Sequence, residues 1–321
     1  MSGRGAGELE GLLLVDKPRG LTSHDVVARL RRLAGQKKIG HTGTLDPLAT
    51  GLLAVLFGPA TRLAPYLTQM KKTYRGRMEL GLATDTDDAS GRVLNRHPGP
   101  WPTEKEVRQA LKEGESEQTP PAFSAVQVGG RRAHRAARAG SPLELAPRRV
   151  TAFRLELIRY QPPEADFEAA VSAGYYIRAL ARDLGRDLGL GGGALTELKR
   201  TGIGPWTLDQ AHTLEDLAAW TGDMWRSGLR PPAEALSHWP ALVLAEPGSI
   251  RHFTQGRRLP AAGPAGRYKI IDGQGRLLGL GQIETAEPFL RPLRIFPVSP
   301  GDRQLTGKEQ ACPSPLKRPV N

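Results

Sequence analysis

The amino-acid sequence predicts an α+β fold, with a mixed, largely antiparallel β-sheet, flanking helices and a small β-rich module at the C-terminal end. Residues 73–82 alternate apolar and polar side chains, as in a strand with one face in solvent. Residues 22–35 repeat apolar side chains at the spacing of an amphipathic helix. After Trp239-Pro240, the chain becomes a series of short apolar runs broken by Gly and Pro, which favours short strands.

The N-terminal elements follow from local patterns. Residues 11–15 (GLLLV) form a short apolar run that predicts a buried strand, and residues 52–57 (LLAVLF) form a second apolar run. For the helix between them, Ser23 is the expected N-cap and Gly35 the expected end, because small hydroxyl residues favour helix starts and glycine favours helix ends.

The middle of the chain mixes helix and strand signals. Thr103 followed by Glu106 is a capping-box pattern, so a helix is expected to begin here and to end at Gly114. Two further strands and one helix are expected at residues 150–160, 167–172 and 177–189.

The C-terminal region is expected to form a separate module. Within it, Asp272-Gly273 lies between two apolar runs, which is a strong hairpin signal. The last residues are rich in Pro, Lys and Gln and predict a disordered tail. We therefore expect a body over residues 1–240, a β-barrel-like module over 241–299 and a tail over 300–321.

Composition limits the class of protein. No apolar run is long enough to span a bilayer, and the N-terminal residues lack the apolar core of an export signal. The one cysteine, Cys312, excludes an internal disulfide and a cysteine-rich zinc site. A cytoplasmic protein without membrane association is expected, and since nothing in the sequence calls for an oligomer, we expect a monomer.

The charge balance favours a polyanionic partner. The chain has 45 Lys and Arg against 33 Asp and Glu, a net charge of +12. Residues 129–149 contain one acid, Glu144, and lack the apolar content of a core element. We interpret this segment as an exposed arm for nucleic acid, with a solvated loop as the alternative. Its arginines are Arg131, Arg132, Arg135, Arg138, Arg148 and Arg149.

Residues 37–53, KKIGHTGTLDPLATGLL, surround a single carboxylate, Asp46, with glycines and threonines. They match neither a phosphate-binding P-loop nor a dinucleotide fingerprint, and no spacing of His and acidic residues predicts a metal site. Because Asp46 precedes a proline, its backbone is expected to be extended. Its carboxylate is then either an uncrowded nucleophile or the cap of an Asx turn.

The motifs resemble those of one family. GLLLVDKPRGLTSHDVV and KKIGHTGTLDPLATGLL are similar to the first two motifs of the TruB family of tRNA pseudouridine synthases. The similarity continues in order through KKTYRGRMELGLATDTDDASG, QTPPAFSAVQVGGRRAHRAARAG, VSAGYYIRALARDLG and GALTELKRTGIG. It extends from residue 11 to about residue 215, and the C-terminal module resembles a PUA domain.

The resemblance implies a pseudouridine synthase fold and a glycosidic isomerisation without a metal or an organic cofactor. Uridine in the T arm of tRNA, at position 55, would be flipped out, detached at N1 and rejoined through C5. Asp46 matches the nucleophile of the family. The resemblance leaves three routes open: attack on the sugar C1′, attack on the pyrimidine C6, or a glycal intermediate.

Further site residues carry over from the family one by one. Tyr74 matches the tyrosine that stacks on the target ring, with an ordinary strand core residue as the alternative. Arg178 matches the arginine that pairs with the catalytic acid, which would favour the ionised carboxylate. The other matches are Tyr176 as an active-site tyrosine, Leu198 against the base, Asp88 in the polar network and His41 in displacement of the base stack.

The resemblance also implies how the RNA is held. Residues 119–150 match the RNA-clamping insertion, and the C-terminal module, with eight basic and four acidic residues over 241–299, would hold the acceptor side of the tRNA. The chain departs from the family pattern at Gln127, His134, Ala173 and Tyr175, which puts the fine contacts of the insertion in doubt.

The sequence leaves two alternative functions open. A non-catalytic tRNA-folding chaperone would use the same RNA surface without needing Asp46. A glycoside hydrolase would need a second carboxylate near Asp46, and Asp88 is the candidate.

Overall fold

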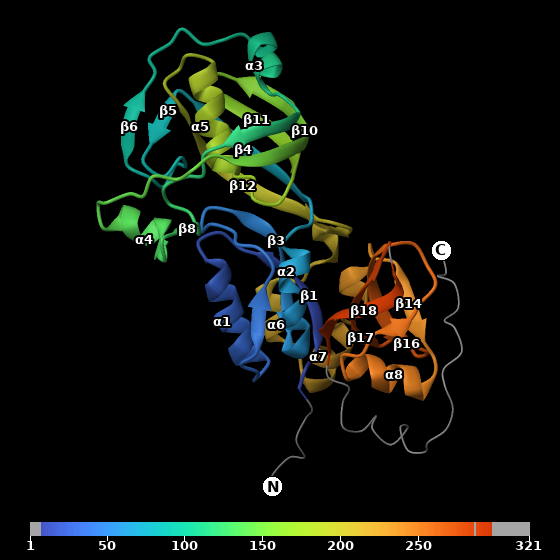
Figure 1. The fold of residues 1–321 in the computed structure, drawn as a ribbon. Coiled ribbons are helices and arrows are strands. Elements are labelled where there is room, and N and C mark those ends of the chain that lie inside the picture. Colours follow the sequence, from blue (N-terminus) through green and yellow to red (C-terminus); the bar gives the residue numbers. More distant parts are fainter. Residues whose placement is uncertain (1–7, 286, 297–321) are drawn as a thin grey trace.

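The computed structural model describes residues 8–285 and 287–296, and its elements form an upper and a lower half of the body and a C-terminal module beside the lower half (Figure 1). A nine-stranded sheet runs through both halves of the body within this described part. Its strands are β1 (Gly11–Lys17), β2 (Ile39–His41), β3 (Thr50–Phe57), β4 (Lys72–Leu80), β7 (Gly114–Gln118), β10 (Arg148–Gln161), β11 (Glu164–Val171), β12 (Gly193–Ile203) and β13 (Trp206–Thr207).

The main path of this sheet has the order β1-β3-β12-β4-β11-β10-β7, with β2 added to β3 and β13 to β12. All pairs are antiparallel except β3 with β12. The predicted mixed, largely antiparallel sheet is therefore confirmed. The helices are α1 (Ser23–Leu33), α2 (Ala64–Leu67), α3 (Glu104–Ala110), α4 (Ala133–Arg138), α5 (Ile177–Asp187), α6 (Leu214–Ala218), α7 (Gly222–Gly228), α8 (Pro247–Thr254) and 3₁₀ turns at Gly58–Leu63, Leu208–Gln210 and Glu234–Leu236.

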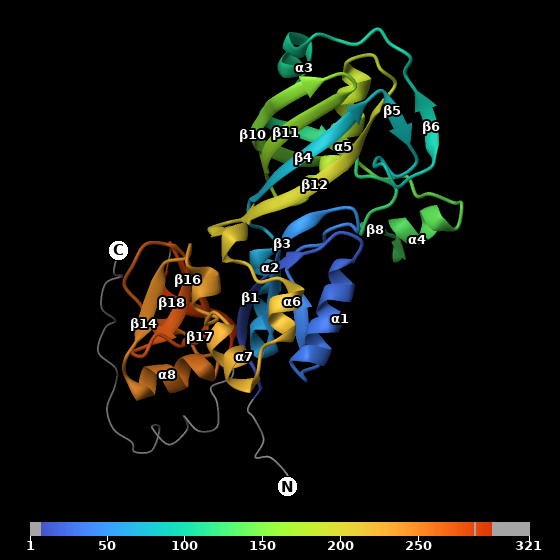
Figure 2. The ribbon, with the colours of Figure 1, turned by 180° about the vertical axis from the view of Figure 1, so that it is seen from behind.

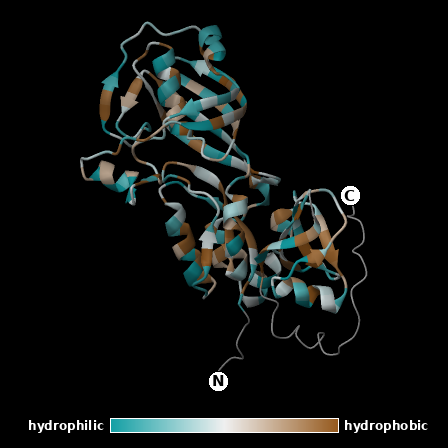
Figure 3. Cartoon of the chain, viewed as in Figure 1, coloured by the Kyte–Doolittle hydropathy of each residue, from teal (hydrophilic) through white to brown (hydrophobic). Residues whose placement is uncertain are grey.

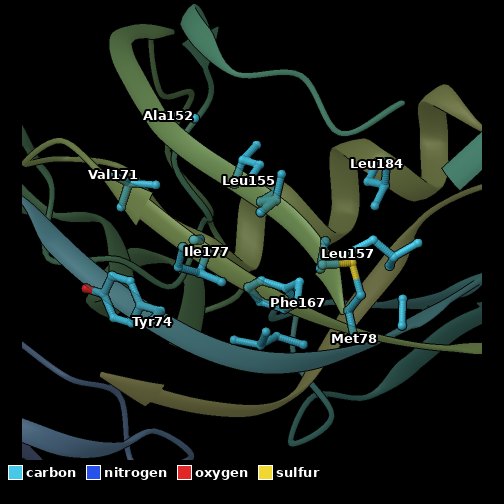
Figure 4. Close-up of a cluster of buried hydrophobic side chains, with 14 of the residues drawn as sticks. Tyr74, Met78, Ala152, Leu155, Leu157, Phe167, Val171, Ile177 and Leu184 are labelled. Atoms are coloured by element: carbon cyan, nitrogen blue, oxygen red, sulfur yellow. The ribbon is translucent and has the colours of Figure 1, made fainter. Parts of the chain in front are cut away.

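Strand β4 has the two faces that its alternation predicts. Tyr74 and Met78 face the apolar cluster under the upper half of the sheet, which Figure 4 shows from close by. On the other face, Arg77 Nε lies 2.6 Å from Asp166 Oδ1, and these two residues are register partners on β4 and β11. Opposite charges across a strand pair help to hold the register.

Helix α1 begins one residue earlier than expected, because Thr22 and not Ser23 is its N-cap. The Thr22 hydroxyl accepts from the Asp25 backbone N–H, and the Asp25 carboxylate accepts from the Thr22 backbone N–H. Ser23 is therefore the first helical residue, and its buried hydroxyl is available for another partner. The capping box of α3 at Thr103 is confirmed, but the helix ends at Ala110 because Gly114 begins strand β7.

The basic insertion, residues 119–150, projects from the body on the side of α1 in both views (Figures 1 and 2). It contains α4 and a short hairpin, and a small apolar cluster of Val126, Ala133 and Leu145 holds it together. A second small hairpin follows β4. These hairpins pair β8 (Gln127–Val128) with β9 (Arg131–Arg132), and β5 (Leu82–Thr84) with β6 (Val93–Arg96).

The C-terminal module is a five-stranded sheet with α8 against it, and many residues of its strands are hydrophobic (Figure 3). The predicted hairpin at Asp272-Gly273 joins two of these strands. Leu280 and Phe296 pack with Leu12 and Leu56 of the body, so the module shares an apolar cluster with the large sheet. The predicted tail at 300–321 lies outside the described residues. The strands are β14 (Ala241–Leu244), β15 (Leu259–Pro260), β16 (Gly266–Asp272), β17 (Leu277–Glu284) and β18 (Glu287–Ile295).

Among the described residues, none of the helices has the length and apolar character needed to span a bilayer.

The parallel contact between β3 and β12 depends on a glycine. Gly51 has φ +95° and is the register partner of Arg200, whose backbone a Cβ at position 51 would strike. Only glycine combines this conformation with so close a backbone approach.

We expect Gly51→Ala to lower the free energy of unfolding by more than about 2 kcal/mol, because conformational strain and a backbone clash add. Urea unfolding measures the loss. Gly35→Ala is the matched control, since Gly35 has φ +62° but open space around it and should lose only about 1 kcal/mol. Equal losses in the two variants would contradict the clash.

Candidate active site

Asp46 lies in a loop whose backbone is fixed on both sides of the carboxylate. The Ser23 hydroxyl accepts a hydrogen bond of 2.8 Å from the Leu45 N–H, which uses the hydroxyl that α1 does not need for capping. The Gly20 N–H donates to the Pro47 carbonyl, and the Ala49 N–H to the Asp46 carbonyl. The side chains of Leu45 and Ala49 are buried in the core. The apolar and hydrogen-bonding contacts on both sides of Asp46 therefore fix the backbone from which its carboxylate projects.

Arg178, in the first turn of α5, joins this loop to two distant segments. Its Nε lies 2.9 Å from Asp46 Oδ2. Its Nη1 and Nη2 donate to the carbonyls of Thr86 and Phe123 at 2.7 and 2.8 Å. The arginine side chain is only 6% exposed, whereas that of Asp46 is 42% exposed. The predicted pairing of Arg178 with Asp46 is thus present, with the arginine inside and the acid open to a ligand.

Asp88 is near the same guanidinium, but its hydrogen bonds are made to other residues. Its Oδ2 lies 3.8 Å from Arg178 Nε, and its Oδ1 accepts from the hydroxyls of Thr86 and Ser90 and from the Ser90 N–H. Its side chain is only 7% exposed. Asp88 therefore belongs to the polar network, where it holds the turn after β5, and presents no open carboxylate to a substrate.

Tyr74 and Leu198 lie on adjacent strands beside this site. Tyr74 is buried, and Figure 4 shows its ring at the margin of the apolar cluster with the hydroxyl directed away from Phe167 and Met78. Leu198, on β12, is half-buried and packs against the same cluster. Tyr74 can thus be both a strand core residue and an active-site residue, because its ring lies at the edge of the apolar cluster and its hydroxyl points away from the cluster.

Tyr176 precedes α5 and links it to the insertion. The amide of Gln118 makes two hydrogen bonds with the Tyr176 backbone, at 2.7 and 3.0 Å. The phenol packs against the apolar cluster of the insertion. Burial raises the pKa of Tyr176, and the charge of Asp46 acts in the same direction, so the phenol stays protonated near neutral pH.

His41 ends β2, five residues before Asp46 in the chain. Its ring meets His24 edge to face at a centroid distance of 5.3 Å, and its buried Nδ1 has no partner among the described residues. Burial, with smaller effects of His24 and Arg200, lowers the pKa of His41 to about 4. The imidazole is therefore neutral at pH 7.

Three buried cations surround the loop. Lys17 donates from Nζ to the carbonyls of Pro18 and Leu21. Lys72 donates to the Thr68 carbonyl. Arg200 donates from Nε to the Leu52 carbonyl at 2.7 Å and from Nη2 to the Gly43 carbonyl at 3.2 Å. Arg200 thus ties β12 both to β3 and to the loop that precedes Asp46.

Within the described part of the chain, backbone carbonyls and not carboxylates are the hydrogen-bond partners of these three cations. Burial lowers the pKa of Lys17 and Lys72 to about 8 each. The sequence patterns predicted no role for Arg200 or Lys72, and for Ser23 only the N-cap of α1, which Thr22 provides. Arg200 follows Lys199 on β12, and adjacent strand residues point to opposite faces, so the pair by itself does not tell which of the two cations is buried.

The six predicted RNA-binding arginines are exposed, in contrast to Arg178 and Arg200. Four lie on β9 and α4 of the insertion, and two begin β10. Their guanidinium groups form no hydrogen bond or ion pair with the described residues. They are thus available to an external anion. In the same described part, no group of three or more His, Cys, Asp or Glu side chains is arranged to hold a metal ion.

The pH dependence of the free energy of unfolding should reveal the burial of Lys72. The unfolded chain, where the amine has its ordinary pKa near 10.5, binds more protons than the folded protein between about pH 8 and 10.5. The contribution of the Lys72 amine to the free energy of unfolding therefore rises with pH in that window, by at most about 1.4 kcal/mol per pH unit. We expect the free energy of unfolding of Lys72→Met to rise less between pH 8 and 10 than that of the wild type.

Urea unfolding at several pH values measures this difference. Lys105→Met, at an exposed position of α3, controls for the loss of a lysine charge as such. A Lys72→Met slope equal to that of the wild type would show that the amine is not desolvated in the fold.

Comparisons with known proteins agree with the geometry. Residues 31–177 match the model of the TruB family pseudouridylate synthase N-terminal domain, and residues 178–237 match that of the tRNA pseudouridylate synthase B C-terminal domain. Both matched segments end before the C-terminal module begins. The tRNA pseudouridine synthase B of Thermobifida fusca is 44% identical over 297 residues, which cover 89% of this chain and 98% of that protein.

Two further similarities extend the comparison. The tRNA pseudouridine synthase B of an Arthrobacter species is 50% identical over 218 residues, 65% of this chain and 71% of that protein. Among solved structures, a chain of an H/ACA ribonucleoprotein bound to a substrate RNA containing 2′-deoxyuridine superposes with a TM-score of 0.68 at 26% identity, covering 91% of this chain and 86% of that one. With two consecutive family models matched and nearly the whole of a relative aligned, the chain belongs to the TruB family of pseudouridylate synthases.

Proposed function

We propose that this pseudouridine synthase isomerises uridine to pseudouridine in the T arm of tRNA, at position 55, with Asp46 as the nucleophile. The observation that carries the proposal is the 2.9 Å ion pair between Asp46 and the buried Arg178. It holds one oxygen of a half-exposed carboxylate, while no donor among the described residues contacts the other oxygen. A positioned, ionised acid of this kind can attack an electrophilic carbon without a metal.

The neighbouring groups suit a flipped uridine. Tyr74 would stack on the ring, Leu198 would pack against it, and Tyr176 would close the site from the insertion side. The N1–C1′ bond breaks, the ring turns and a C5–C1′ bond forms, while the proton leaves C5 and N1 ends protonated. Since atoms and electrons balance within the nucleotide, the residues named here need no external reactant.

The exposed arginines of the basic insertion would bind the phosphates of the T arm. Extruding a base from a folded loop costs a few kcal/mol, which phosphate contacts offset. The PUA-like C-terminal module would contact the acceptor side of the tRNA. We propose that residues 1–240 form the catalytic domain and residues 241–299 form this module. We also propose that the enzyme is monomeric and cytoplasmic.

The two-carboxylate alternative has little geometric support. A retaining glycosidase needs two carboxylates that face one substrate about 5 Å apart. Asp88 is buried, and one of its oxygens accepts three hydrogen bonds from Thr86 and Ser90. It therefore lacks the exposure of a second catalytic acid, and one of its two oxygens is already engaged.

We expect Asp46→Asn to lower the rate of isomerisation by at least about a thousandfold, because an amide retains the shape of the nucleophile but not its charge. Carbodiimide-dependent primer extension on an unmodified tRNA transcript is the measurement. Wild-type protein should give a new stop at the T-arm uridine, and the variant none.

Asp209→Asn, at an exposed carboxylate in the Leu208–Gln210 turn, is the matched control and should retain full activity. An active Asp46→Asn protein would overturn the assignment of the nucleophile. Salt-sensitive tRNA binding without any stop from wild-type protein would instead favour the non-catalytic chaperone.

The insertion arginines should control the salt dependence of tRNA binding. Replacing Arg131, Arg132, Arg135 and Arg138 together by Gln should reduce the slope of log K against log salt by about one for each lost phosphate contact. Filter binding between 50 and 200 mM salt tests this over roughly the range in which such contacts dominate. The corresponding four-lysine variant keeps the charge and should keep most of the slope, whereas equal slopes for the wild type and the Gln variant would exclude the insertion as a phosphate-binding surface.

A further inference from the structure

A second cavity lies between the body and the C-terminal module, apart from the Asp46 site. Its volume is about 660 Å³, and we call it the aromatic pocket after Tyr66, His238 and Trp239 in its wall. Helix α2 supplies Tyr66, and the turn between β12 and β13 forms another wall. Figure 1 shows α2 and the end of β12 on the side of the body that faces the module. The volume falls within the ~300–1,000 Å³ typical of small-molecule sites.

The rings of the aromatic pocket are held in a fixed arrangement. Tyr66 meets Trp239 edge to face at 5.5 Å, and His238 meets Trp239 at 6.3 Å with an interplanar angle of 82°. Tyr66 and Trp239 also pack against the apolar cluster that the body shares with the module. Burial, with a smaller effect of Lys269, lowers the pKa of His238, so this ring is neutral at pH 7. The wall therefore offers preorganised, uncharged ring faces.

Two cations complete the wall. Lys71 and Arg267 come from the body and from the module, and both are exposed. Neither side chain has a hydrogen bond or ion pair with the described residues, and no Asp or Glu lines the cavity. Unpaired cations beside aromatic rings, without a nearby acid, complement a ligand that combines a π-face with negative charge.

We infer that the aromatic pocket binds unpaired nucleotides of the RNA substrate that lie outside its T arm. Bases stack on aromatic side chains only when their faces are open, which excludes a paired helix, and Lys71 and Arg267 would contact the flanking phosphates. The inference rests on the proposed function, because it takes the same RNA as substrate. It assigns to the junction of body and module a recognition role separate from the chemistry at Asp46.

Two RNAs and two charge-matched variants test this inference. The RNAs are a full-length tRNA transcript and its isolated T-arm hairpin, and the variants are Lys71→Gln/Arg267→Gln and Lys105→Gln/Lys112→Gln. The second pair removes the same charge at exposed positions in and after α3, at the opposite end of the body (Figure 1). Filter binding gives Kd and its salt dependence, and urea unfolding verifies that both variants are folded.

For Lys71→Gln/Arg267→Gln, we expect Kd for the full-length tRNA to rise about tenfold and the salt slope to fall by about two, while Kd for the hairpin stays unchanged. The control variant should match the wild type on both RNAs. An unchanged Kd for the full-length tRNA would overturn the inference. An equal loss on both RNAs would also overturn it, since the pocket would then act on the T arm or on the fold.

Ultraviolet crosslinking of the wild type supplies an independent readout. Full-length tRNA should leave a nucleotide adduct on a peptide that contains Tyr66 or Trp239, and the hairpin should leave none; the absence of any adduct from full-length tRNA would contradict stacking in the pocket. Isomerisation of the hairpin by wild-type protein tests the proposed function separately. A failure there would leave the binding result for the pocket intact.

Discussion

The buried guanidinium of Arg178 is the contact on which the geometry of the site depends. It joins the carboxylate of Asp46 to the carbonyls of Thr86 and Phe123, and so connects the Asp46 loop, the turn after β5 and the start of the basic insertion. A buried charge is tolerated only when its donors find partners. Here each partner comes from a different segment, so these segments must be in place together for Arg178 to be satisfied.

The same arrangement links the basic insertion to the loop that carries Asp46. Phe123 and Gln118 flank the start of the insertion, and they contact Arg178 and the backbone of Tyr176 respectively. A displacement of the insertion would therefore act on Tyr176, which precedes α5, and on Arg178 in its first turn. The position of the insertion is thereby coupled to that of Asp46 through few contacts.

Arginine and lysine serve two opposite purposes in this chain. The insertion exposes its arginines, where each can exchange counterions for a phosphate. Around the Asp46 loop, Lys17, Lys72 and Arg200 are buried against backbone carbonyls. Burial lowers the pKa of Lys17, and the negative charge of Asp46 opposes this effect. Net charge alone does not separate these two uses.

The sequence by itself determined the α+β class, most of the elements and the pairing of Asp46 with Arg178. Strand alternation and capping patterns are local, and the motif around Asp46 is one continuous stretch of sequence, residues 37–53. The tertiary structure decided the rest. Thr22 rather than Ser23 caps α1 because the Ser23 hydroxyl is taken by Leu45, 22 residues away. Arg200 is buried because Leu52 and Gly43, distant in the chain, supply carbonyls to it. Burial of a polar group depends on partners from elsewhere in the fold, and a local pattern carries no information about them.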